Sequence, residues 1–111
     1  GGGGTRPGPV QYCLFGLAAC FAGTFVAFAS EDGVTIRSLK VAAENRIDLS
    51  KAMNIAERPM VEGALLTVTV DADADDTKLA DIERRARQRC PGVYCLTNPI
   101  PLTTKVQRAG R

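Results

Sequence analysis

The 111-residue sequence contains no histidine, and aromatic residues make up only 5% of it. Without an imidazole the chain cannot form a Ser-His-Asp triad, a Cys-His pair, a histidine metal site or a switch that titrates at physiological pH. The net charge is also small: 14 Lys and Arg against 12 Asp and Glu leave an excess of two positive charges. The basic residues are scattered except for four arginines between positions 84 and 89. This distribution argues against a general nucleic-acid binder.

Four cysteines, at positions 13, 20, 90 and 95, are the soft nucleophiles of the chain. The gaps within the two pairs do not match the close spacing of structural zinc sites on both sides, so no metal site is expected. A chain of this length with 45% hydrophobic residues buries one core and has no room for a deep cleft between lobes. Any active site must therefore lie against that core or at a subunit interface.

The N-terminal third divides into a leader and one long helix. Five glycines and two prolines in GGGGTRPGP predict a flexible leader over residues 1–8, followed by a domain over residues 9–108. No charge occurs from Tyr12 to Ala29. Pro9 suits a helix start and Gly33 suits the position just after a helix end, so we predict a helix over residues 9–31.

The rest of the chain alternates strands with a second helix. Period-two patterns predict a strand around residues 39–49, bulged or turned near Asn45, and another around residues 66–72. Asp75 or Asp76 caps a predicted helix over residues 77–90, which Pro91 and Gly92 end. The apolar stripe of this helix is Leu79, Ile82, Ala86 and Cys90, and a last strand is predicted from Ile100, Leu102, Thr104 and Val106. The order indicates an α+β domain with antiparallel pairing.

The uncharged run of residues 12–29 has three interpretations. It reaches the lower limit for a membrane span, although it is rich in Ala and Gly and lacks an aromatic belt or a basic flank behind it. Arg6 before the run and Ala27-Phe28-Ala29 before Ser30 also fit a signal peptide of an exported protein. The third interpretation is a helix that is apolar all round and buried at the centre of a soluble fold or dimer.

Several motifs in a fixed order favour the third interpretation. They are PVQYCLFGLAAC at residues 9–20, RCP at residues 89–91 and NPIP at residues 98–101. From about residue 8 to residue 106 the chain resembles the OsmC/Ohr family of thiol peroxidases. The resemblance implies a long buried central helix and a second helix packed on an antiparallel sheet, in an intertwined homodimer with active sites at the subunit interface. It also implies reduction of organic hydroperoxides by a cytoplasmic protein that an external dithiol recycles, with no metal or organic cofactor and no membrane or nucleic-acid partner.

Two cysteines can carry the chemistry of such a peroxidase. The cycle needs one thiolate that attacks the O–O bond and becomes a sulfenic acid, and a second thiol that condenses with it as a disulfide. Cys90 is predicted at a helix C-terminus, where the dipole disfavours a thiolate, so it suits the resolving role. The resemblance makes Cys20 the peroxidatic residue. Cys13 and Cys95 are interpreted as small apolar packing residues.

Activation of Cys20 needs a cation, because burial in apolar surroundings raises the pKa of a thiol. In the family that the chain resembles, an Arg on an N-terminal β segment provides it, supported by a Glu just after the Pro that starts the helix. That segment has no counterpart here, and Val10 stands at the Glu position. Either the segment lies outside this sequence or the chain is a divergent member with weak or no peroxidase activity. Arg6 is the candidate substitute.

The main rival hypothesis is a non-catalytic OsmC-like module whose apolar pocket beside Cys20 binds a small hydrophobic ligand.

Two further features have structural interpretations. Gly16 and Gly23 indicate close approach by another helix, such as one from a second subunit. The solvated face of the second helix is predicted to hold Arg84, Arg85, Arg87 and Arg89.

Overall fold

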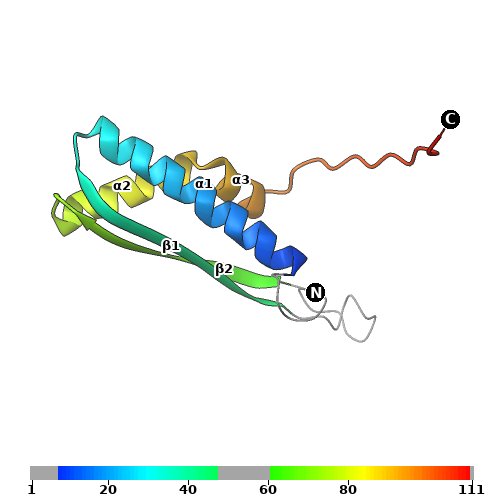
Figure 1. Cartoon of the computed structure of the whole chain (residues 1–111), viewed down its shortest axis with the longest axis horizontal. Helices are drawn as coiled ribbons and strands as arrows, with labels where there is room; N and C mark the ends of the chain where they lie inside the picture. The colour runs from blue at the N-terminus through cyan, green and yellow to red at the C-terminus, as the bar shows by residue number, and fades with distance from the viewer. Residues whose placement is uncertain (1–7, 48–60, 111) are drawn as a thin grey trace.

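A computed structural model describes residues 8–47 and 61–110 of the chain. Its helices and strands are α1 (Pro9–Glu31), β1 (Ile36–Ile47), β2 (Val61–Ala72), α2 (Asp76–Arg89) and α3 (Pro91–Thr97). The helices lie on one side of a two-stranded antiparallel sheet (Figure 1). The predicted α+β class is confirmed, and the helix predicted from Pro9 to Glu31 has the predicted limits.

The end of α1 reverses the chain into β1. Gly33 adopts a positive φ of 73°, which a side chain would disfavour. Its N–H donates to the carbonyl of Ser30, and the N–H of Val34 donates to the carbonyl of Ala29 at 2.8 Å. These two bonds form a Schellman motif, which satisfies carbonyl groups that the helix itself leaves free. Gly33 therefore has the role that its position in the sequence predicted.

The two strands pair with their apolar side chains toward the helices. Leu39 lies opposite Val70, and Val41 lies opposite Val68. The register shifts between Asn45 and Ile47, which confirms the predicted irregularity. The intervening positions of both strands are exposed, so the sheet has one apolar and one polar face, as period-two alternation requires.

The core forms where the two long helices meet the sheet. Phe21 and Phe25, one turn apart on α1, are almost fully buried and have ring centroids 6.4 Å apart. Ile82 and Ala86 of α2 are completely buried beside them. The side chain of Asp75 accepts a hydrogen bond from the N–H of Lys78 and caps α2. The predicted apolar stripe and cap of the second helix are confirmed.

Arg85 joins α2 to the end of α1, which corrects the prediction that all four arginines lie on a solvated face. Its guanidinium binds Asp32, which follows α1, and Asp81 of its own helix at 3.0 Å. It also lies 5.1 Å from the ring centre of Phe28, a cation–π contact. Only a quarter of the Arg85 side chain is exposed. Its aliphatic stem and its charge both contribute to the helix–helix contact.

Asp32 makes the stability of this contact depend on pH. Its hydrogen bonds with Arg85 and Lys78 hold the pKa of the carboxyl below its usual range. The resulting stabilisation is fully present above the ordinary Asp pKa of about 4 and is lost as the pH falls through the lower folded-state pKa. We expect Asp32→Asn to lower the urea midpoint at neutral pH and to flatten its fall between about pH 4 and about pH 2. Equal pH profiles for variant and parent would contradict this.

The chain after α2 differs from the prediction. Pro91 and Gly92 follow the end of α2, as predicted, but they also begin α3, a seven-residue helix that was not predicted. The predicted last strand over residues 100–106 is wrong within the single chain: residues 98–110 form no strand and are exposed, and they run away from the body (Figure 1). Pro99 and Pro101 lack the N–H groups that a sheet would use, and neither described strand pairs with this segment.

One side of α1 packs on the protein, and the other side remains open. Of the helices within residues 8–47 and 61–110, α1 meets the length and composition required to cross a membrane. Leu17, Ala18, Phe21, Phe25 and Ala29 are nevertheless buried against the rest of the fold. The close approach predicted at Gly16 and Gly23 does not occur within the single chain, because no described atom would lie within 4 Å of an added Cβ at either glycine.

Candidate active site

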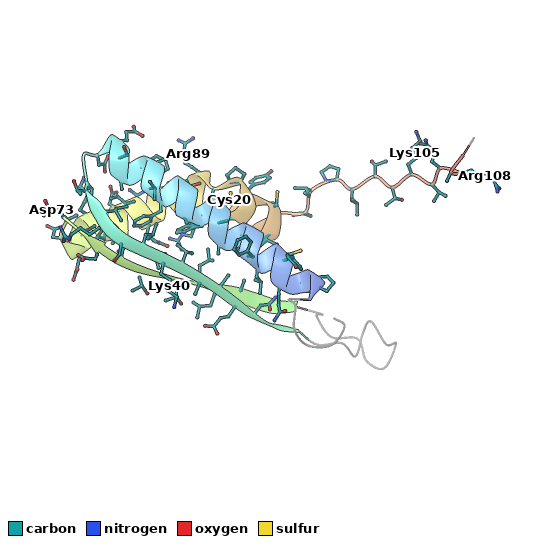
Figure 2. The ribbon with its side chains drawn as sticks, in the orientation of Figure 1. Cys20, Lys40, Asp73, Arg89, Lys105 and Arg108 are labelled. Atoms are coloured by element: carbon teal, nitrogen blue, oxygen red, sulfur yellow. The ribbon has the colours of Figure 1, made fainter. Side chains whose placement is uncertain are left out.

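The structure brings two of the four cysteines together. Cys20 lies in the middle of α1, on the part of the helix beside α3 (Figure 2). Cys90 lies between α2 and α3, at the C-cap of one helix and the N-cap of the other. The two Sγ atoms are 3.4 Å apart, within hydrogen-bond distance of each other. Residues that are 70 positions apart in the sequence therefore form a dithiol pair within one chain.

Pro91 explains why Cys90 occupies this junction. A residue that precedes proline is kept out of the helical region, and Cys90 has an extended backbone with φ −77° and ψ 118°. α2 consequently ends before it, while the fixed φ of Pro91 suits the first position of a new helix. The carbonyl of Cys90 accepts from the N–H of Tyr94 at 3.0 Å and begins α3. The turn between the helices thus holds the Cys90 sulfur against α1.

Gly92 allows α3 to contact α1 at Cys20. A Cβ placed on Gly92 would lie 3.2 Å from the Cβ of Cys20, 3.4 Å from its Sγ and 3.6 Å from a methyl carbon of Leu17. The first of these distances is shorter than nine in ten real contacts of a Cβ atom, so a side chain here would require its neighbours to move by a few tenths of an ångström. Gly92 was not singled out as a site residue from the sequence.

The two sulfurs differ in their surroundings. Cys90 is buried, with 2% of its surface exposed, whereas Cys20 is partly accessible. A hydrogen bond from the backbone N–H of Gly92 lowers the pKa of Cys20, but the hydrogen bond with Cys90, burial and the nearby Cys95 raise it. The net direction is upward. None of the groups in residues 8–47 and 61–110 that shift this pKa carries a positive charge.

An apolar cavity of about 500 Å³ lies beside the dithiol pair. α1 contributes Leu17 and Phe21, which flank Cys20 in the sequence, and α3 contributes Val93, which follows Gly92. Glu83 and Arg87 of α2, with Arg87 Nε 3.7 Å from a carboxylate oxygen of Glu83, add a charged edge. The lining does not include Cys20, so the cavity adjoins the dithiol without enclosing it.

Comparisons with known proteins identify the family and the fold of the chain. A family model described as OsmC-like protein matches residues 2–105. The chain belongs to the OsmC-like protein family. Among solved structures it is similar to an OsmC-like protein from Mycoplasma pneumoniae, with 21% identity and a TM-score of 0.67 over 82% of this chain and 67% of that one.

A second similar structure is an OsmC-like hydroperoxide resistance protein from Jannaschia sp. CCS1. The identity is 14% and the TM-score is 0.68, over 98% of this chain and 72% of that one. No match was found among curated proteins. At these identities the similar structures establish the OsmC-like fold, and the apolar helix α1 is an integral part of that fold.

Three other residues had a role predicted from the sequence: Cys13, Cys95 and Arg6. Cys13 and Cys95, interpreted as packing residues, are both exposed, because Cys13 lies on an outward side of α1 and Cys95 on an outward side of α3. Arg6, the candidate activator of the Cys20 thiolate, lies outside the described residues. Among the described residues no group of three or more His, Cys, Asp and Glu side chains is placed to hold a metal ion.

Proposed function

We propose that this OsmC-like chain is a thiol-dependent peroxidase that reduces organic hydroperoxides through Cys20 and Cys90. The observation that carries the proposal is the 3.4 Å separation of the two sulfur atoms. A disulfide bond needs about 2.05 Å, so the sulfurs must approach by only roughly 1.4 Å. The name of the Jannaschia protein, a hydroperoxide resistance protein, supports the same substrate class.

The reaction proceeds in two chemical steps. The thiolate of Cys20 attacks the terminal oxygen of the hydroperoxide, the O–O bond breaks, and Cys20 becomes a sulfenic acid while the alkoxide leaves and takes up a proton as the alcohol. Cys90 then attacks the sulfur of the sulfenic acid, which releases water and forms the Cys20–Cys90 disulfide. An external dithiol supplies the two electrons and two protons that restore both thiols.

Accessibility supports the two proposed roles better than helix dipoles do. Cys90 lies at the C-terminal end of α2 as predicted, but it also begins α3, so its position no longer implies one dipole direction. Cys20 is the more exposed of the two sulfurs, which suits the thiol that must meet hydroperoxide. For the same reason the reductant would attack the sulfur of Cys20 in the disulfide and release Cys90.

A positive charge is the component that the described residues do not supply. The raised pKa of Cys20 means that little thiolate is present near neutral pH, and only the thiolate attacks peroxide. A guanidinium beside the sulfur would reverse this shift. Arg6, three positions before Pro9 at the start of α1, remains the candidate in this sequence.

The partners of the proposed enzyme are a second copy of the chain and an external dithiol in the cytoplasm. Exposed apolar side chains support the homodimer, for example Phe15, which is 72% exposed on α1, and Leu102, which is 86% exposed in the C-terminal segment. The alternating Ile100, Leu102, Thr104 and Val106 lack a strand partner among the described residues. An intertwined dimer would offer such a partner.

The cavity favours one alternative function. Its 500 Å³ volume and apolar lining fall within the usual range of small-molecule sites, and the pKa of the neighbouring Cys20 is raised. A chain with an unreactive Cys20 would then act as a binding module for a small hydrophobic ligand, without turnover.

Thiol counting after oxidation separates the two functions. The reduced protein is mixed with one equivalent of cumene hydroperoxide, and its free thiols and cysteine-containing peptides are measured by mass spectrometry. For the peroxidase we expect loss of two of the four thiols and a single disulfide that joins Cys20 to Cys90. Retention of all four thiols would reject the peroxidase and leave the binding module, and a disulfide between other cysteines would reject the assigned mechanism.

A further inference from the structure

The cavity beside the dithiol pair has a charged edge as well as an apolar body. We propose that it binds a monocarboxylate with a straight apolar tail, and that Arg87 binds the carboxylate while the tail lies between α1, β2 and α3. The inference goes beyond both functions considered above, because binding of this ligand requires neither cysteine to react. It adds the chemical class of the ligand and the residue that recognises its head group.

The body of the cavity suits an apolar tail. Its volume is about 500 Å³, and three elements of the fold line it. Each methylene group that moves from water into such surroundings raises affinity about fourfold, so a chain of several methylene groups gains most from this lining. The apolar side chains are Leu17 and Phe21 from α1, Ala64, Leu66 and Val68 from β2, and Val93 and Leu96 from α3.

The polar groups of the cavity come together on α2. Among the described residues that line it, the polar side chains are those of Glu83, Arg87 and Thr97. The hydroxyl of Thr97 already donates to the carbonyl of Val93 at 2.8 Å. Glu83 and Arg87 lie one turn apart on α2, so a carboxylate and a guanidinium are the groups that can meet the head of a ligand.

The charge at this edge favours an anionic head. Nε of Arg87 is 3.7 Å from a carboxylate oxygen of Glu83, which is longer than a hydrogen bond. The ion pair therefore leaves the planar N–H fork of the guanidinium open to a ligand, and such a fork binds a carboxylate through two parallel hydrogen bonds. Residues 83–89 hold four arginines against one glutamate, a net charge of +3. This excess attracts an anion and repels an ammonium group.

Titration of the reduced protein with sodium octanoate, followed by NMR, tests the proposal. The methyl signals of Leu66 and Val68 report occupancy of the cavity that these side chains line. We expect octanoate to saturate the shifts of these signals, and acetate, which lacks the tail, to leave them unchanged at the same concentrations. Octylammonium has the same tail and the opposite charge, and it should bind at least roughly fivefold more weakly. Octylammonium binding as tight as that of octanoate, or no response of these signals to octanoate, would overturn the proposal.

Arg87→Gln tests the assigned head-group contact. The variant loses a hydrogen bond to a charged group at a side chain that is 62% exposed, where solvent weakens the interaction. We therefore expect the Kd for octanoate to rise roughly 5- to 10-fold. Arg89→Gln is the matched control, because Arg89 is exposed on the same helix and is not among the residues that line the cavity. It should stay within about twofold of the parent, since salt screens a distant charge. Equal weakening in both variants, or an unchanged Kd in Arg87→Gln, would show that Arg87 does not bind the carboxylate.

The titration contains no peroxide, so its result is separate from the thiol count that tests the peroxidase. A chain that binds octanoate through Arg87 but retains all four thiols after treatment with cumene hydroperoxide would refute the peroxidase and uphold the carboxylate site. A chain that forms the Cys20–Cys90 disulfide but does not bind octanoate would do the reverse.

Discussion

Cys20→Ser should reduce hydroperoxide consumption to the rate of the dithiol alone. Serine preserves the shape of the side chain on α1, but at neutral pH its hydroxyl has no anionic form comparable to a thiolate and cannot attack the O–O bond. Turnover is measured as loss of cumene hydroperoxide in the presence of excess dithiothreitol. Turnover equal to that of the parent would eliminate Cys20 as the attacking residue.

Cys90→Ser should give a different defect. Cys20 can still be oxidised, but the sulfenic acid has lost the thiol 3.4 Å away that would trap it, so dimedone should label Cys20 after a single oxidation and excess peroxide should carry it to the sulfinic acid. Cys13→Ser and Cys95→Ser are the matched controls, because both thiols are exposed. They should keep the turnover of the parent, and loss of activity in either would require a different cysteine pair.

Local chemistry made the long elements predictable from the sequence. Pro9, the uncharged run and Gly33 each constrain α1 in the same direction, so propensity, hydrophobicity and turn chemistry agree. The strand patterns likewise depend on only one buried face. Residues 100–106 show the limit of such patterns: alternation indicates where a strand has an apolar side, but a strand also needs a neighbour, and neither described strand pairs with that segment.

The pairing of Cys20 with Cys90 was predictable in part. Each cysteine was expected on an apolar helix face, and the resemblance joined them, but no local signal states that two helices cross with their sulfurs 3.4 Å apart. The close contact of Gly92 with Cys20 was hidden because Pro-Gly is a common stop signal. A proline also suits the first position of a helix, and here a new helix follows at once. Here the same Pro-Gly follows the end of α2 and lies at the start of α3.

Phe25→Ala should cause the largest loss of stability. Phe25 is 1% exposed and belongs to the core cluster of α1 and α2 side chains on the sheet. Truncation removes the buried ring and leaves a cavity, which costs about 3–5 kcal/mol in the free energy of unfolding. Because domains of this size have about 5–15 kcal/mol in total, the variant should be partly unfolded even without denaturant, and the dithiol pair should open with it.

Val26→Ala provides the matched control on the next position of the same helix. Val26 is 45% exposed, so its truncation should change the free energy of unfolding by no more than about 0.5 kcal/mol. Urea unfolding at one fixed protein concentration measures both variants, because any dimer would make the midpoint depend on concentration. If Phe25→Ala and Val26→Ala unfold at similar midpoints, α1 does not pack on α2 and the sheet through the side that contains Phe25. The placement of Cys20 next to Cys90, which depends on that packing, would then also be lost.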